Sequence, residues 1–371
     1  MKDANGAYDL LVAGGGPAGT SAAITAARLG ARVLLLERGR FPRDKVCGEF
    51  VSPEALGLLE SLLGGSPGAA TMLRSASRIT HARAFVAGQC LEFSLAAPAA
   101  SIPRFDFDAG LWRAAEAAGV AARQGVAVES IEQNGVFRVA TSAGVFSAKS
   151  VVNASGRWSN LNSAAELRPG PSPRWQWLGI KAHFNEESPP PSADLYFFEG
   201  GYCGVLPARH GRVNACAMVR SDRARSLLEV FALHPELRER SRRWQPATEP
   251  VLTAPLVFRA PRSLRSGVLL AGDSAGFLDP FAGDGISAAL HSGALAAQAL
   301  ADFWRQRMSL QQAALRYHRD YELALRPAFR TAGRIRWLLR LPAALHAPVA
   351  KVLRTGPVAR YLVSRTRTAI R

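Results

Sequence analysis

Three glycines near the start of the chain have the spacing Gly14-x-Gly16-x-x-Gly19, which suits the binding of a pyrophosphate. Gly14 permits a tight turn, Gly16 lets the backbone approach a phosphate, and Gly19 allows a helix to pack closely on a strand. Pro17 and Ala18 would begin that helix, whose positive N-terminal end faces the anion. The motif predicts a dinucleotide-binding site in this part of the chain.

The elements around the glycines must place them at one edge of a sheet. Residues 9–13 predict a buried strand, residues 17–29 an alanine-rich helix, and residues 33–36 a second strand. Glu37 ends the second strand, where its carboxylate can accept hydrogen bonds from a ribose, and Arg38 follows it as a further cofactor-binding candidate. An acidic residue at the end of the second strand is typical of dinucleotide-binding units. The strand, helix, strand and acid together therefore predict a dinucleotide site more strongly than the glycines alone.

A second informative stretch, residues 268–286, predicts a buried strand, a Gly-Asp turn and a loop that leads into a glycine-rich helix start. Together with the first motif it resembles the FAD-binding pattern of the geranylgeranyl reductase and aromatic-hydroxylase flavoproteins. The resemblance implies that Asp273 holds the ribitol chain of FAD and that the loop after Pro280 brings backbone N–H groups to the flavin, whose reduced form is negatively charged. The cofactor contacts implied here are Gly272, Asp273, Pro280, Gly283, Gly285 and Ile286.

Three further segments carry the same resemblance. Residues 38–49 look like the loop with a Lys-x-Cys-Gly signature in the reductase branch. Residues 102–111 resemble an arginine-containing segment that returns to the cofactor, and residues 196–207 resemble an aromatic strand pair over the substrate pocket. The cofactor contacts that these segments imply are Lys45, Cys47, Gly48 and Arg104.

The chain also departs from the pattern at two places. The hydroxylase branch usually has Asp-Gly where this chain has Ser155-Gly156, which weakens the expectation of tight coupling to NADPH. The reductase branch typically has Tyr-x-Trp-x-Phe-Pro, and residues 202–207 lack the Trp, which leaves room in the pocket. The motifs therefore indicate the flavoprotein superfamily more firmly than they indicate either its reductase branch or its hydroxylase branch.

Two side chains are candidates for the chemistry. Cys47 would donate a proton to a substrate carbon or pack against the flavin, although a small buried thiol is the commoner role of a free cysteine. Tyr202 would point into the pocket from its strand, although an aromatic residue in a strand more often belongs to the core. The scattered histidines His183, His210 and His291 are expected to be structural, and no metal site is predicted.

Three functions are weighed. The leading one is a FAD-dependent oxidoreductase in which hydride from reduced flavin saturates a C=C bond of an isoprenoid-like substrate. The alternative is a monooxygenase that hydroxylates a phenolic or polyketide-derived ring through a C4a-hydroperoxide, and a non-catalytic electron carrier is a minor alternative. A halogenase is a lesser interpretation still, because residues 175–180 miss the Trp-x-Trp-x-Ile-Pro spacing by one and lack the Pro.

Length and composition agree with this architecture, since 371 residues with 48% hydrophobic content can bury a large core. The predicted fold class is α/β: a Rossmann-like FAD-binding domain (GR2-type) with an inserted β-rich substrate domain and C-terminal helices. The predicted boundaries are 1–80, 101–170 and 255–300 for the FAD-binding domain, 81–100 and 171–254 for the insert, and 301–371 for the basic C-terminal helices.

The chain contains four cysteines, too few for a disulfide framework, and no signal peptide precedes the first strand. A cytoplasmic location is therefore expected, with the alternative of attachment to the inner face of the membrane. Because a second GxGxxG motif is missing from the sequence, electrons are expected from NAD(P)H bound transiently or from an external reductase.

The formal net charge of +17 is uneven, because residues 323–371 contain many arginines and no acidic residue. Two interpretations of this tail stay open: its helices lie on an anionic membrane surface, from which a hydrophobic substrate would enter, or they cap the core with their charges toward solvent. Nucleic acid is not expected as a partner, since no recognition motif accompanies the charge.

Overall fold

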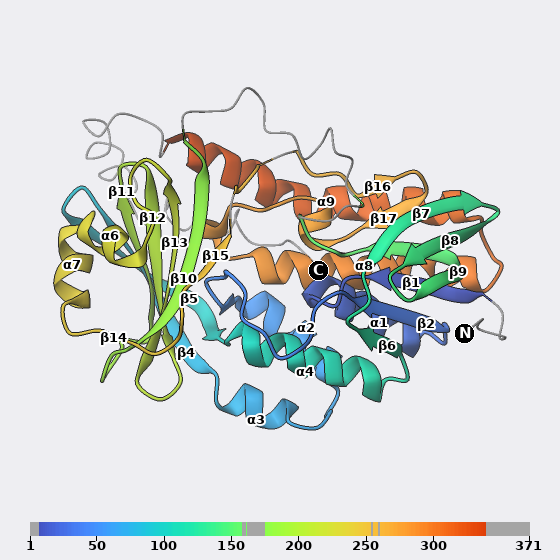
Figure 1. Cartoon of the computed structure of the whole chain (residues 1–371), viewed down its shortest axis with the longest axis horizontal. Coiled ribbons are helices and arrows are strands. Elements are labelled where there is room, and N and C mark those ends of the chain that lie inside the picture. Colours follow the sequence, from blue (N-terminus) through green and yellow to red (C-terminus); the bar gives the residue numbers. More distant parts are fainter. Residues whose placement is uncertain (1–6, 158–160, 162–174, 254, 259, 339–371) are drawn as a thin grey trace.

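The computed structural model of the protein describes residues 7–157, 161, 175–253, 255–258 and 260–338. Two β-sheets lie next to each other along the long axis of the molecule, the first at the right of Figure 1 and the second at the left. Helices cover the first sheet and fill the region where the two sheets meet (Figure 1).

The first sheet has a parallel centre with the strand order β17-β9-β1-β2-β6. These strands are β1 (Tyr8–Ala13), β2 (Val33–Glu37), β6 (Ala121–Gln124), β9 (Gly144–Asn153) and β17 (Val268–Leu270). Antiparallel additions are β7 (Val128–Asn134), β8 (Val136–Thr141) and β16 (Leu264–Arg265). Every residue of β2 is buried, as expected for a central parallel strand that is covered on both faces.

The helices associated with this sheet are α1 (Pro17–Arg28), α2 (Pro53–Leu63), α3 (Ala69–Arg74), α4 (Arg104–Ala117), α8 (Gly285–Trp304) and α9 (Leu310–Leu338). Helix α1 packs against α8, and α9 packs on the other side of α8. Two short 3-10 turns, η1 (Gly272–Ser274) and η2 (Pro280–Ala282), connect β17 to α8. Because α1 starts directly after β1 and α8 follows β17, both helices begin near the carboxyl ends of parallel strands.

The second sheet has the order β14-β10-β13-β12-β11-β4-β5-β3, with β15 paired to β10. Its strands are β3 (Phe50–Val51), β4 (Ser77–Val86), β5 (Gln89–Ser101), β10 (Trp177–Asn185), β11 (Ser192–Phe198), β12 (Gly201–Ala208), β13 (Arg212–Arg220), β14 (Gln245–Pro246) and β15 (Val251–Thr253). Helices α6 (Leu227–Ala232) and α7 (Pro235–Ser241) follow β13.

The two faces of the second sheet have different surroundings because side chains alternate along each strand. On β10, Ile180, Ala182 and Phe184 join a hydrophobic cluster with residues of α6 and α7, and we call this the outer face. Lys181 and His183 alternate with them and lie on the inner face, toward the first sheet. A functional site between the two sheets would therefore be lined by residues of the inner face.

The predicted α/β fold class with a Rossmann-type sheet is confirmed. The predicted strands at residues 9–13 and 33–36 and the helix at residues 17–29 are present as β1, β2 and α1, each with one end that differs by one residue. Residues 77–80 and 101 pair within the second sheet although they fall outside the predicted insert, while the division into domains itself stays a prediction. Within the described residues, none of the helices combines the length and apolarity needed to cross a bilayer. The tail beyond residue 338 lies outside the described part.

We predict that Gly293→Ala destabilises the protein by about 1–3 kcal/mol, because it forces two closely packed helices apart. A Cβ built on Gly293 of α8 would lie 2.1 Å from the carbonyl oxygen of Ala18 in α1. Thermal or urea unfolding of the variant would measure the loss. Gly57→Ala in α2 is the matched control, since nothing lies within 4 Å of its added Cβ, and we expect it to be neutral or slightly stabilising. Equal stability of both variants would contradict the packing argument.

Candidate functional site

The glycine motif forms an open cradle at the start of α1. Gly14 has φ +108°, and a Cβ there would lie 2.3 Å from Ala154 O, so only glycine fits this turn. A Cβ on Gly19 would lie 1.7 Å from Gly14 O, which shows how closely helix and turn pack. Around Gly16, by contrast, nothing lies within 4 Å of an added Cβ. The backbone is thus bare at a helix N-terminus, an arrangement that suits a phosphate group of FAD.

Glu37 and Arg38 lie on the other side of this turn. The Glu37 side chain is buried. Its carboxylate accepts hydrogen bonds from the N–H groups of Gly15 and Gly39, both at 2.8 Å, and forms an ion pair with Arg43 at 3.3 Å. Oε1 accepts from both Gly39 and Arg43, whereas Oε2 accepts from Gly15 alone and can accept one further bond, so a ribose hydroxyl remains compatible with this geometry. Arg38 is exposed, and its predicted contact with the cofactor stays a prediction.

A cavity of about 440 Å³ extends from the start of α1 to the inner face of the second sheet. It brings together residues that are far apart in the sequence, including most of the predicted site. The predicted residues that line it are Gly16, Pro17, Ala18, Lys45, Cys47, Gly48, Arg104, Tyr202, Gly272, Asp273, Pro280, Gly283, Gly285 and Ile286. Gly14, Gly19, Glu37 and Arg38 are not part of its lining.

The second motif brings another helix N-terminus to the same cavity. Gly272 has φ +59° and donates its N–H to Ser292 Oγ at 2.9 Å, which holds the turn before Asp273 against α8. After η2, Gly283 adopts φ +67° and Gly285 begins α8, with no atom within 4 Å of an added Cβ at Gly285. Two bare helix N-termini, of α1 and α8, therefore face one space, which gives it a positive potential suited to an anionic cofactor.

Charged side chains surround the region between these helices. Arg104, which is buried, makes a two-pronged ion pair with Asp108 at 2.8 Å. Burial alone would lower the pKa of Arg104, but Asp108 and the neighbouring Cys47 raise it above its ordinary value. Burial and then Arg104 lower the pKa of Lys45, while Asp273 and Asp108 oppose that shift. Lys45 and Asp273 are thus close enough to interact across the cavity wall.

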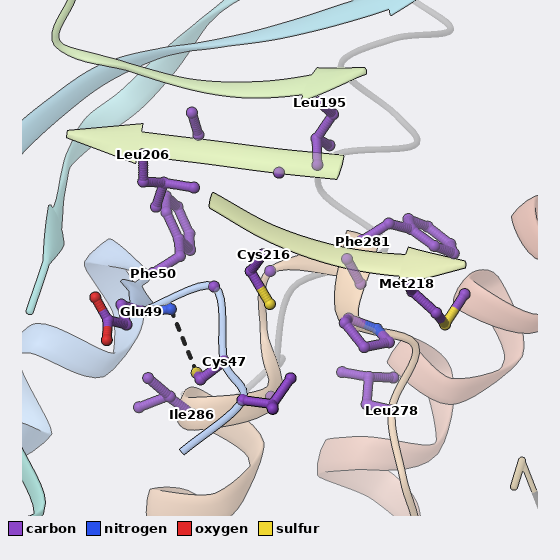
Figure 2. A pocket seen from close by; sticks show the side chains of 18 of the residues that line it. Cys47, Glu49, Phe50, Leu195, Leu206, Cys216, Met218, Leu278, Phe281 and Ile286 are labelled. Carbon is purple, nitrogen blue, oxygen red and sulfur yellow. Dashed lines mark hydrogen bonds between the residues drawn. The ribbon is translucent and has the colours of Figure 1, made fainter. Parts of the chain in front are cut away.

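Cys47 lies on the loop that lines one side of the cavity, and its Sγ accepts a hydrogen bond from the Glu49 N–H at 3.3 Å. Figure 2 shows this contact, with Cys216 reaching toward it from the second sheet. Burial raises the pKa of the Cys216 thiol well above its ordinary value, and the nearby Cys47 adds to the shift. Among the four cysteines, Cys47 and Cys216 both line the cavity, and Cys90 does not.

Tyr202 is on the inner face of the second sheet, as predicted, and packs among aromatic rings. Its ring centroid lies 5.8 Å from that of Phe197 and 6.2 Å from that of Phe281. Burial, reinforced by the charge of Asp279, raises the pKa of its hydroxyl well above the usual value. Tyr202 is therefore buried in the core and also part of the cavity wall, and its role in the chemistry stays a prediction.

Sequence reasoning missed several residues of the site. Arg157 lines the cavity with its guanidinium 4.3 Å from the centroid of the Phe277 ring. Lys181 and Asn214 contact the loop that carries Cys47, and Glu49 within that loop donates its N–H to the Cys47 Sγ. The sequence held one usable signal, because Lys181 and His183 interrupt the apolar strand at alternate positions and so lie on the face opposite its core residues.

Comparison with known proteins agrees with this geometry. A menaquinone reductase of Mycolicibacterium smegmatis is 27% identical, over 98% of this chain and 90% of its own length. Digeranylgeranylglycerophospholipid reductase 2 of Methanopyrus kandleri is 27% identical, over 80% of this chain and 77% of its own. The structure of the myxobacterial chondrochloren halogenase, a FAD-dependent enzyme, superposes with a TM-score of 0.73 at 24% identity, covering 86% of this chain and 80% of that one, and shows that the fold is shared.

Residues 7–322 match the model of a protein family described as the FAD binding domain. This match covers most of the chain, and the cavity with its two helix N-termini suits the same cofactor. The protein therefore belongs to the FAD binding domain family and is a FAD-dependent oxidoreductase.

Proposed function

We propose that the protein reduces a carbon–carbon double bond of a hydrophobic, isoprenoid-like substrate. The observation that carries this proposal is the continuity of the cavity, which joins the cofactor-binding turns to an apolar wall on the second sheet. That wall includes Ala82, Ala84, Leu91, Phe93, Leu195 and Leu206. An apolar chain placed along it would present a double bond near Cys47, at the junction with the cofactor region.

The names of the two relatives support reduction. One is a reductase of menaquinone and the other of digeranylgeranylglycerophospholipid. The missing tryptophan of the reductase pattern supports a substrate with some bulk, because Gly204 lines the cavity at that position. An added Cβ on Gly204 would first meet Leu195 Cδ2, at 3.5 Å, so the wall has room there.

The cofactor-binding residues keep the roles that the resemblance implies. The N–H groups at the start of α1, next to Gly16 and Ala18, would hold the pyrophosphate, and those at the start of α8 would face the flavin ring. Asp273 would hold the ribitol chain, and Glu37 would accept a ribose hydroxyl with the remaining lone pair of Oε2. When bound and reduced, FAD supplies the hydride for the reaction.

The side chains of the protein would complete the addition. Cys47 donates the proton from its Sγ to the substrate carbon next to the one that takes up hydride, and the resulting thiolate regains a proton from water. Tyr202 keeps its own proton because burial raises its pKa, and it positions the substrate from the opposite wall. The apolar wall excludes water from the reacting bond. Electrons would come from NAD(P)H bound transiently or from an external reductase.

We predict that the FAD-loaded protein, reduced chemically without oxygen, adds two hydrogen atoms to a menaquinone or a geranylgeranyl lipid. Product mass spectrometry measures the addition. Cys47→Ser should lower turnover roughly 10²–10⁴-fold, the range lost with a general acid, while the flavin content stays the same. Cys90→Ser is the control, because Cys90 is exposed and outside the cavity.

Unchanged turnover in Cys47→Ser would remove Cys47 from the mechanism. A product that gains one oxygen atom, formed only in aerated buffer, would instead support the monooxygenase alternative and overturn the reductase.

We predict that Asp273→Ala purifies with little FAD, because the carboxylate that would bind the ribitol chain is lost. The flavin absorbance per protein measures occupancy, and the match of the circular dichroism spectrum to wild type shows that the fold persists. Asp302→Ala is the matched control, since Asp302 is at the far end of α8. Full occupancy in Asp273→Ala would show that the second motif does not hold the cofactor.

We further propose that α9 binds the surface of an anionic membrane. Leu315, Arg319, Leu323, Arg326 and Arg330 are all exposed, and their spacing of three or four residues puts them in one stripe along the helix. Exposed leucines beside arginines are typical of interfacial helices, in which each basic residue adds about 1 kcal/mol near an anionic surface. The basic tail beyond residue 338, outside the described residues, would add to this contact.

We predict that the protein floats with phosphatidylglycerol vesicles on a density gradient and stays at the bottom with phosphatidylcholine vesicles. The double variant Leu315→Gln/Leu323→Gln should bind the anionic vesicles less tightly. Leu228→Gln is the control, since Leu228 is at least as exposed as the two leucines of α9 but lies on α6. If wild type and the double variant both fail to float, the arginine-rich helix does not bind a membrane.

A further inference from the structure

Side chains from the inner face of the second sheet hold the Cys47 loop, which we define as residues 44–49. Lys181 Nζ on β10 lies 2.7 Å from Asp44 Oδ1 and 2.9 Å from Glu49 Oε1. Asn214 on β13 donates from Nδ2 to the carbonyl oxygen of Cys47 at 3.0 Å. These contacts hold the loop at Asp44 before Cys47, at Cys47 itself and at Glu49 after it.

Glu49 is the point where the contacts meet. Its carboxylate accepts from three donors, namely Lys181, the ring Nε2 of His183 at 2.9 Å and the backbone N–H of Arg104 at 3.2 Å. Because a carboxylate only accepts, the His183 nitrogen that faces it must carry a hydrogen. The acid is fully buried, so its charge depends on this set of donors.

The backbone of Glu49 is in a conformation that side chains rarely adopt. Its φ of 65° lies in the left-handed region, which is unfavourable for a residue with a Cβ. In this conformation its N–H donates to the Sγ of Cys47. The donors around the Glu49 carboxylate therefore stabilise a strained turn that in turn contacts the thiol.

Lys181 is well suited to this task because it is buried in the strand yet remains charged. Burial lowers its pKa, but Glu49 and Asp44 more than compensate, so the pKa is raised above its ordinary value. Replacing it with a neutral residue would leave the Glu49 carboxylate without its cation in a buried place. The loop would then relax toward solvent, where Asp44 already lies partly exposed.

We propose that Lys181, acting through Glu49, is a positioning residue for the Cys47 thiol, with His183 and Asn214 as its supports. The charge pair between the second sheet and the loop determines where Sγ lies in the cavity. This inference rests on the proposed function only for its consequence, namely that a misplaced thiol delivers its proton poorly. The position of the thiol itself can be measured without turnover.

The test compares Lys181→Met with wild type, both FAD-loaded and both carrying Cys90→Ser to remove the exposed thiol. Peptide mass spectrometry follows the rate at which iodoacetamide alkylates Cys47. We expect the rate to rise about fivefold or more, and kcat to fall at least tenfold with KM changed less than twofold, since small misplacements cost on the order of 10²-fold. Unchanged alkylation of Cys47 in Lys181→Met would overturn the proposal.

Two further variants separate positioning from stability. Lys181→Met/Glu49→Gln removes the uncompensated charge, so its melting temperature should recover toward wild type while alkylation stays fast. If alkylation returned to the wild-type rate together with the melting temperature, the pair would be merely structural.

Asn214→Ala leaves the ion pairs in place and frees only the Cys47 carbonyl, so it tests the same loop if Lys181→Met does not fold. It should also speed alkylation, and an unchanged rate there would count against the proposal.

Asp194→Asn is the matched control, because Asp194 is a buried carboxylate on another strand of the same sheet. It pairs with Arg83 and Arg240 and, among the described residues, makes no ion pair with the Cys47 loop. We expect a lower melting temperature and no change in alkylation. A failure of Cys47→Ser to affect turnover would refute the acid role of Cys47 alone, whereas unchanged alkylation in Lys181→Met would refute the positioning alone.

Discussion

Helices α1 and α8 can lie side by side because Gly293 has no side chain at the point where α8 crosses the backbone of Ala18. Ser21 adds a hydrogen bond across the same contact, from its Oγ to the carbonyl oxygen of Leu290 at 2.6 Å. The two helices start after different strands of one parallel sheet, so this close approach brings their N-termini to a common space. The bare N–H groups of both helices therefore face the same cavity, an arrangement that suits an anionic cofactor.

The second sheet completes the site, and its inner face has a polar part and an apolar part. Near β10 and β13 that face is polar, with Lys181, His183 and Asn214 directed at the Cys47 loop. Toward β4 and β5 it is apolar, with residues such as Leu91 and Phe93 in the cavity wall. One sheet thus holds the loop that carries the reactive candidate and also provides an apolar wall of the cavity.

A fold shared with a FAD-dependent halogenase does not determine the chemistry, because the same two-sheet architecture can enclose different reactions. The features of this chain that bear on the chemistry are local: a cysteine in the loop beside the cofactor region, and an apolar wall with glycine at position 204. These features agree better with reduction of a lipid-like double bond than with insertion of oxygen. The likeness to two reductases over most of the chain points the same way.

The sequence by itself determined the nucleotide-binding half of the molecule. Gly14, Gly16 and Gly19 have roles that depend on local backbone geometry, and the strands beside them are long apolar runs, so spacing alone identifies them. The Gly272-Asp273 turn is also a local pattern, but its role at the cofactor came from the resemblance of residues 268–286 to the FAD-binding pattern. Resemblance also pointed to Cys47 and Tyr202, both of which line the cavity.

Only the tertiary structure revealed which groups meet at the Cys47 loop. Glu49 and Lys181 are 132 positions apart, and no local pattern shows that a strand lysine faces a buried glutamate. Such contacts depend on how the second sheet docks on the first, which is decided by long-range packing rather than by periodicity. For the same reason the shape of the cavity, and the path it offers a substrate, could be known only from the folded chain.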